Sequence, residues 1–252
     1  MYLFNCDLDN TLIYSYKHDI GADKINVEQY QGREISFITS RTFELLKEVA
    51  EKTVFVPTTT RTVEQYGRID LGIHTPQYAL VCNGGILLKN GVEDSEWYLE
   101  SLRRIQESKA ETEKGFLLLR DDGRRIFDLR LLRDLFVFTK CNEPELVVKD
   151  LRNALDTGKV DVFHNGVKVY IVPKQLNKGE AVARLKARLG IRTIIAAGDS
   201  EFDLPMLERA DYAIAPDSLR NRMDRNENIC FVKKEEMFSE KVLEQVIVLC
   251  RS

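Results

Sequence analysis

The sequence lacks any apolar run near the ~20 residues that a membrane-spanning helix needs. No two of its five cysteines have the CxxC spacing of a zinc or redox site. The histidines His18, His74 and His164 are scattered without metal-ligand spacing, so none is predicted to be catalytic. A formal net charge of -3 provides no basic field to attract nucleic acid. We therefore expect neither a membrane nor a nucleic acid as partner.

The composition is that of a globular protein, with 44% hydrophobic and 31% charged residues in a chain of 252. Cys6 and Cys82 lie in apolar runs, where a free cysteine behaves as a small buried hydrophobe. The N-terminal run reaches Asp7 too early for the apolar core of a signal peptide. The basic doublets at 103–104 and 124–125 are interleaved with acids, which is typical of solvated faces. We expect a cytoplasmic protein, a monomer or weak homo-oligomer.

Short apolar runs alternate with helical patterns at both ends of the chain. Strands are predicted at 2–6, 53–56, 78–82, 193–197, 212–215 and 229–232, and helices at 42–52, from about 62, 178–189, 203–209 and 239–249. Such alternation predicts an α/β fold with a doubly wound parallel sheet built from both ends of the chain.

The pattern changes in the middle of the chain. Asn90-Gly91 between apolar residues indicates a hairpin. Helices are predicted at 95–114 and 143–155, and strand-like pieces at 116–119, 135–139, 160–163 and 167–172. We predict an inserted α+β domain at 86–173, between core segments 1–85 and 174–252. The polar stretch 14–33 is expected to form a mobile flap beside the site entrance.

The chemistry concentrates after the predicted strands, where an open parallel sheet binds ligands. Asp7 and Asp9 follow the first strand, Thr58 to Arg61 the second, and Asn83-Gly84-Gly85 the third. Asp199 and Asp203 follow a later strand. Adjacent carboxylates repel unless a cation relieves them, and an oxygen-rich set suits Mg²⁺. Each motif alone also fits an ordinary turn or a capped helix; their conjunction, in this order, indicates a site.

These motifs resemble those of the haloacid-dehalogenase-like superfamily of phosphatases. Asp7-Leu8-Asp9-Asn10-Thr11-Leu12 resembles its DxDxT motif, and Thr59 in PTTTR its second motif. Lys178 in Asn177-Lys178-Gly179 resembles the third-motif lysine, and Gly198 to Asp203 the fourth motif, GDxxxD. The short motifs PTTTR, NGG and NKG are similar to those of the Cof-like and sucrose-phosphatase-like branch. The position of the insert, between the second and third motifs, is also similar to that branch. Members of that branch carry an α/β cap that closes over the core.

The resemblance implies a role for each matching residue. Asp7 would be the nucleophile, and Asp9 the acid and base for the leaving oxygen and the attacking water. Asp7, the Asp9 carbonyl and Asp199 would hold Mg²⁺. Thr59 and Lys178 would orient and neutralise the phosphoryl group, and Asp203 would support Lys178 or metal-bound water. The remaining substrate contacts are predicted at Thr58, Arg61, Asn83 and Gly84.

Three positions depart from the family pattern. Asn10 replaces a glycine, but asparagine tolerates left-handed backbone geometry. Thr60 replaces another glycine, so Thr58 is the alternative to Thr59, and Phe202 replaces an asparagine. The acid at Asp9 matches the phosphatases and argues against dehalogenation.

The predicted function is Mg²⁺-dependent hydrolysis of a small phosphorylated metabolite, for which a sugar phosphate is a candidate by family analogy. Two alternatives remain open. A phosphotransferase or phosphomutase would use the same aspartyl phosphate, and a non-catalytic phosphate-binding regulator would keep only the fold.

Overall fold

The computed structural model describes residues 2–223 and 228–251, which divide into two compact units. The first unit is Met1–Asp94 with Lys178–Ser252, and the second is Ser95–Asn177. Within the described ranges, no helix is both long and apolar enough to cross a bilayer.

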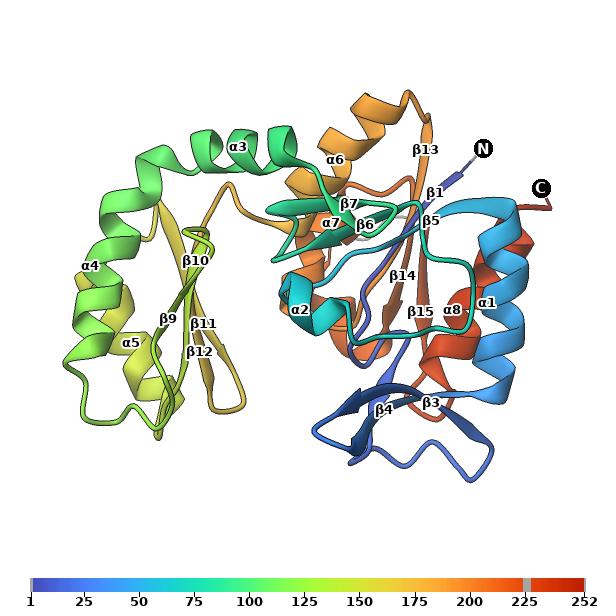
Figure 1. Ribbon diagram of the computed structural model, residues 1–252, viewed down its shortest axis with the longest axis horizontal. Helices are drawn as coiled ribbons and strands as arrows, with labels where there is room; N and C mark the ends of the chain where they lie inside the picture. The colour runs from blue at the N-terminus through green and yellow to red at the C-terminus, as the bar shows by residue number, and fades with distance from the viewer. Residues whose placement is uncertain (1, 224–227, 252) are drawn as a thin grey trace. The chain divides into compact units, whose positions relative to one another are not determined.

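The first unit is built on a five-stranded parallel sheet of order β15-β14-β13-β1-β5 (Figure 1). Its strands are β1 (Tyr2–Cys6), β5 (Thr53–Pro57), β13 (Thr193–Ala197), β14 (Tyr212–Pro216) and β15 (Ile229–Val232). Because β1 pairs with both β5 and β13, it lies inside the sheet, which explains its nearly continuous apolar sequence.

Helices cover the sheet on both sides, with α1 and α8 together on one side and α6 and α7 on the other (Figure 1). The helices of this unit are α1 (Ser40–Lys52), α2 (Val63–Tyr66), α6 (Lys178–Leu189), α7 (Leu204–Glu208) and α8 (Phe238–Leu249), with short 3-10 helices at Glu201–Asp203 and Asp217–Arg222. Leu46 of α1 and Val246 of α8 are buried against Phe4 of β1 in one hydrophobic cluster. The predicted doubly wound α/β core is confirmed.

The first unit also has two small antiparallel sheets, whose strands occur along the chain between β1 and β5 and between β5 and β13. One has the order β2-β4-β3, from β2 (Tyr14–Ser15), β3 (Lys24–Tyr30) and β4 (Arg33–Thr39); we call β3 and β4 with their turn the flap hairpin. About half of the expected loose stretch at 14–33 is therefore strand. Polar and apolar residues alternate in β3 only from Lys24 to Glu28, and the alternation is lost after the bulge, which leaves a short strand pattern.

The other small sheet is β6-β7-β8, from β6 (Tyr78–Val81), β7 (Ile86–Lys89) and β8 (Val92–Glu93). The hairpin expected at Asn90-Gly91 is present, with both residues at positive φ. Because β7 pairs with β6 over its whole length, residues 86–94 belong to the first unit, and the second unit begins at Ser95.

The second unit has an antiparallel sheet of order β11-β12-β10-β9 and its own apolar core. Its elements are α3 (Ser95–Arg104), a 3-10 turn (Gln106–Ser108), α4 (Lys109–Arg120), β9 (Arg130–Leu132), β10 (Phe136–Lys140), α5 (Pro144–Ala154), β11 (Val160–Asn165) and β12 (Lys168–Pro173). Val137, Ile171 and Val162 lie opposite one another on the face that packs on α4 and α5. The strand expected at 116–119 is instead the end of α4, where Leu119 is buried at helical spacing from Thr112 and Gly115.

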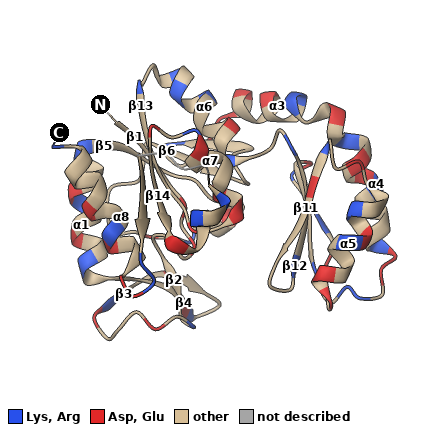
Figure 2. Cartoon of the chain, turned by 180° about the vertical axis from the view of Figure 1, so that it is seen from behind, with Lys and Arg blue, Asp and Glu red and all other residues tan. Residues whose placement is uncertain are grey.

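Acidic and basic residues are interspersed along the helices of both units (Figure 2). In the doublets, Arg103 and Arg104 both pair with Glu100, and Arg124 pairs with Asp122 and Asp150. Arg103 and Arg104 thus lie on a mixed, solvated surface, as their sequence context indicates, whereas Arg124 and Arg125 are half-buried.

Candidate active site

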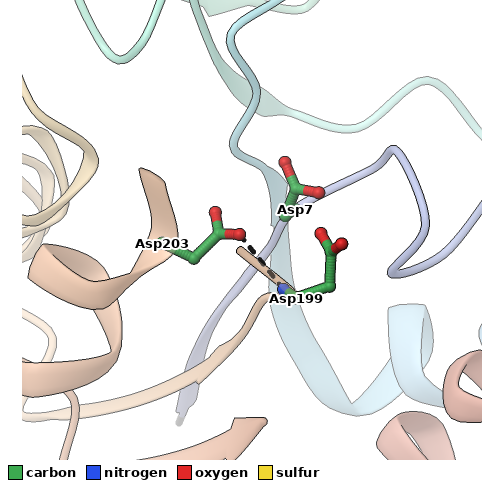
Figure 3. Close-up of side chains that lie close together, drawn as sticks. All are labelled: Asp7, Asp199 and Asp203. Atoms are coloured by element: carbon green, nitrogen blue, oxygen red, sulfur yellow. Dashed lines mark hydrogen bonds between the residues drawn. The ribbon is translucent and has the colours of Figure 1, made fainter. Parts of the chain in front are cut away.

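Carboxylates from two strand ends meet beside the middle of the parallel sheet. Asp7 directly follows β1, and its backbone N–H donates to Ala197 at the end of β13 (2.9 Å). Asp199 and Asp203 follow β13, and the three side chains lie close together (Figure 3). Each offers a carboxylate oxygen within 4.8 Å of the others. Adjacent parallel strands thus bring together residues almost 200 positions apart.

Lys178, the first residue of α6, links two of these carboxylates. Its Nζ donates to Asp7 Oδ1 at 2.5 Å and to Asp203 Oδ1 at 2.6 Å. The lysine is only 1% exposed. Burial disfavours its charged form, but the carboxylates of Asp203 and Asp7 outweigh that effect, and the pKa of Lys178 is raised. The ammonium group is therefore a fixed positive charge beside Asp7.

Asp203 organises the loop after β13. Its second oxygen, Oδ2, accepts hydrogen bonds from the backbone N–H of Asp199 (3.1 Å) and from Ser200 N–H and Oγ–H (3.0 and 2.9 Å). Since Lys178 occupies Oδ1, both oxygens of Asp203 have partners. Asp203 therefore supports Lys178 and the Asp199 loop.

Asp7 and Asp199 are the members of the trio suited to hold a cation. Burial, aided by the charges of Asp203 and Asp199, raises the pKa of Asp7 despite the opposing effect of Lys178. Burial, followed by the charge of Asp203, also raises the pKa of Asp199, to about 7. Two desolvated carboxylates of this kind are stabilised by a hard divalent cation with oxygen ligands. The donor set thus fits Mg²⁺.

Thr11 is a neighbour that the sequence prediction gave no role. It is fully buried, and its Oγ–H donates to Asp199 Oδ1 (3.3 Å). Thr11 is the threonine of the DxDxT motif, and this position in the motif could have identified it as a site residue from the sequence. Asn10 before it has φ 63°, the left-handed conformation expected for the asparagine that replaces a family glycine.

Asp9 does not join the carboxylate trio. Its side chain is 48% exposed and is held by Arg61, whose Nε donates to Oδ2 (2.8 Å) and Nη2 to Oδ1 (2.7 Å). Arg61 was predicted to contact substrate; here its guanidinium contacts Asp9 in a two-pronged ion pair.

The geometry distinguishes the two candidate threonines. Thr58 Oγ accepts from Asn5 Nδ2 (3.0 Å) and donates to the Val56 carbonyl (3.1 Å), so its hydroxyl proton is used within the strand. Thr59 Oγ accepts from the Arg61 N–H (3.1 Å), which leaves its own proton for another acceptor. Both are fully buried. Thr59 is therefore better suited to donate to a phosphate oxygen.

Asn83 and Gly84 form a tight turn after β6. Cys82, Asn83 and Gly84 all have positive φ, at 52°, 58° and 86°. The Asn83 N–H donates to the Thr59 carbonyl (3.0 Å), and the Cys82 N–H to that of Arg61 (2.8 Å). The turn therefore buttresses the loop that carries Thr59 and Arg61.

A parallel α/β core with acidic strand ends and a buried lysine defines an enzyme-like site. A family model described as haloacid dehalogenase-like hydrolase matches residues 85–222, more than half of the chain. The chain belongs to this family, and the predicted resemblance is confirmed.

The chain is also similar in sequence to a named relative and in fold to solved structures. Over 172 residues the chain is 26% identical to a phosphoglycolate phosphatase of Methanopyrus kandleri, covering 65% of this chain and 71% of the relative. In fold it is similar to the sucrose-phosphatase of Synechocystis sp. PCC6803, with TM-score 0.70, 16% identity and coverage of 98% and 97% of the two chains. It is also similar to a trehalose-6-phosphate phosphatase of Aspergillus fumigatus, with TM-score 0.56, 16% identity and coverage of 100% and 93%. The predicted enzyme class, a phosphatase of this superfamily, is confirmed.

Proposed function

We propose that the chain is a Mg²⁺-dependent phosphomonoesterase that hydrolyses a small phosphorylated metabolite through an aspartyl phosphate on Asp7. The observation that carries this proposal is the buried Asp7 carboxylate, held by Lys178 next to Asp199. Relatives named for phosphoglycolate, sucrose and trehalose 6-phosphate support a small organic phosphate, with sugar phosphates the first class to assay.

In the first half-reaction, an oxygen of Asp7 attacks the phosphorus. The Asp7 O–P bond forms as the bond from phosphorus to the leaving oxygen breaks, and Asp9 gives its proton to that oxygen. Lys178 stabilises the charge on the transferring group, and the Thr59 hydroxyl donates to one of its oxygens. In the second half, Asp9 takes a proton from water, which attacks phosphorus and releases Asp7.

Asp7, the Asp9 backbone carbonyl and Asp199 would hold Mg²⁺, which offsets the repulsion between the phosphoryl group and the Asp7 carboxylate. Thr58, Asn83 and Gly84 would shape the loop that carries Thr59, whose hydroxyl would bind the phosphate. The inserted segment, predicted at 86–173, would serve as the cap that selects the leaving group; the compact unit Ser95–Asn177 contains most of it.

The test compares the wild type with Asp7→Asn on a panel of phosphorylated metabolites, with Mg²⁺ and with EDTA. Since the nucleophile is lost, kcat should fall by at least about 10⁴-fold in the variant. EDTA should abolish wild-type turnover, and Mg²⁺ should restore it. Glu51→Gln, at an exposed position of α1, is the control and should retain wild-type kcat.

Full activity of Asp7→Asn would exclude Asp7 as nucleophile, and undiminished activity in EDTA would exclude the metal. Phosphate transfer to an added alcohol in preference to water would indicate the phosphotransferase alternative. An absence of turnover, with phosphate still bound, would indicate the regulator.

A further inference from the structure

The flap hairpin contains a buried carboxylate, Glu28, which contacts Arg61. The register of β3 with β4 shifts on both sides of Glu28, which marks a bulge. As a result, Val27 and Glu28 are both buried, although neighbours in a regular strand point to opposite faces. Asn26 stabilises the bulge, because its Nδ2 donates to the carbonyls of Glu28 and Ser36 (both 3.0 Å). The backbone is thus built to direct Glu28 inward.

Both oxygens of Glu28 are fully engaged. Oε2 accepts from Ser36 Oγ–H (2.7 Å), and Oε1 accepts from Arg61 Nη1 (2.8 Å) and Arg68 Nε (3.1 Å). The side chain is 0% exposed. A buried carboxylate is costly unless it is paired and hydrogen-bonded in this way. The interaction with Arg61 is therefore strong and geometrically defined.

Arg61 joins Glu28 to Asp9. Nη1 binds Glu28, while Nε and Nη2 bind the two oxygens of Asp9. A guanidinium group is planar and its donors have fixed directions. Because Glu28 holds Nη1, it also fixes the directions of Nε and Nη2. These two donors in turn fix the position of the half-exposed Asp9 carboxylate.

We propose that Glu28 is a positioning residue for the acid–base step, acting through Arg61 to place the Asp9 carboxyl group. This inference rests on the proposed role of Asp9. Asp9 gives its proton to the leaving oxygen as the P–O bond breaks, and Arg61, which already holds the Asp9 carboxyl group, stabilises the negative charge that develops on it. Without Glu28, Arg61 keeps its charge but loses its anchor, and Asp9 loses its defined position.

The consequence depends on the leaving group. The oxygen of an alkyl phosphate such as glycerol 3-phosphate needs a proton in order to leave, whereas p-nitrophenolate leaves without one. Since kcat/KM includes only the steps up to departure of the leaving group, it isolates the acid role of Asp9 from its later role as base.

The experiment measures kcat/KM of Glu28→Gln with Mg²⁺ for both substrates. For glycerol 3-phosphate we expect kcat/KM to fall by about 10²-fold or more, as when general acid catalysis is lost. For p-nitrophenyl phosphate we expect a fall of less than about threefold, because its leaving group needs no proton. Glu34→Gln, exposed on β4 of the same hairpin, should match the wild type on both. Equal losses on the two substrates would show a merely structural role and overturn the inference.

Two further variants keep the test decisive if Glu28→Gln folds poorly. Glu28→Asp keeps the buried charge but shortens the reach to Arg61, so it should show the same selectivity with a smaller loss. In an Arg61→Lys background, Glu28→Gln should add no further selective loss, because the path from Glu28 to Asp9 is already broken. Additive selective losses would overturn the inference. If the wild type hydrolyses glycerol 3-phosphate poorly, the alkyl phosphate that it hydrolyses fastest in the metabolite panel takes its place. If the wild type hydrolyses no member of that panel, the proposed function fails as well, whereas equal losses in an active enzyme exclude only the role of Glu28.

Discussion

At the scale of single residues, the site contains three carboxylates and one buried lysine. Lys178 contacts Asp7 and Asp203, whereas Asp199 accepts a hydrogen bond from the hydroxyl of Thr11. The trio therefore retains an unbalanced negative charge in a desolvated place. Such a place favours either a bound cation or a bound proton.

The proton alternative makes stability depend on pH when no metal is bound. With a pKa of about 7, Asp199 binds its proton more tightly in the folded protein than in the unfolded chain, where an aspartate titrates near ~3.9. Its contribution to the free energy of unfolding is therefore greatest below that lower value. It declines by up to about 1.4 kcal/mol per unit as pH rises, until pH passes about 7.

Urea unfolding in EDTA at pH 5, 6 and 7 measures this dependence. The free energy of unfolding of the wild type minus that of Asp199→Asn should decrease by more than about 1 kcal/mol between pH 5 and 7, because asparagine does not titrate. Glu51→Gln should follow the wild type. Parallel profiles for the wild type and Asp199→Asn would show that Asp199 is ionised throughout.

Sequence motifs were sufficient to nominate Asp7, Lys178, Asp199 and Asp203, and the fold brings these four together. They could be found because each follows a recognisable strand or begins a helix. Glu28 was not predictable, because its burial depends on a β-bulge and on a partner from another element. A sequence pattern contains neither.

At the scale of elements, α6 and α7 approach each other at Gly179. A Cβ built on this glycine would lie 2.1 Å from the Pro205 carbonyl oxygen and 2.5 Å from its carbon. Both atoms belong to the backbone and cannot rotate away. Gly179, which follows Lys178 in the NKG motif, is thus required for the close contact between α6 and α7.

Gly179→Ala should therefore lower the free energy of unfolding by at least about 2 kcal/mol, at the upper end for overpacking. It should also lower kcat, because α6 must move and Lys178 moves with it. Urea unfolding and steady-state assays check the two effects. Gly123→Ala is the matched control, since nothing lies within 4 Å of its added Cβ. Unchanged stability in Gly179→Ala would contradict the close packing.

Elements with a single regular period were predicted well, including α1, α6 and the strands of the parallel sheet. The capped start of α2 at Thr62 was also found. Errors arose where the apolar pattern was ambiguous. The run Phe116–Leu119 has strand-like composition, but it completes the helical face of α4. Such short apolar runs do not distinguish a strand from a helix.

At the scale of the whole molecule, each of the two compact units has a hydrophobic core among its described residues. The core of Ser95–Asn177 draws on the described residues of that unit alone, from α4, α5 and three strands, with Val137 and Ile171 fully buried. A unit that buries its own apolar surface can fold by itself.

We predict that the excised segment Ser95–Asn177 shows a cooperative thermal transition by circular dichroism. Val137→Asp should abolish that transition, because it would bury an unpaired charge. Val167→Asp, at a position 47% exposed, should preserve it. A broad, non-cooperative melt of the unmodified segment would show that it needs the rest of the chain.

The interior position of β1 has a consequence for the order in which the protein is made. β1 is translated before the other strands of the parallel sheet, yet one of its two neighbours, β13, is translated only after the entire second unit. Until then β1 can pair with β5 alone, and Asp7 has neither Lys178 nor the Asp199 loop beside it. A nascent chain halted anywhere before Lys178 is therefore without the charge partner of its nucleophile, and the site is completed only late in translation.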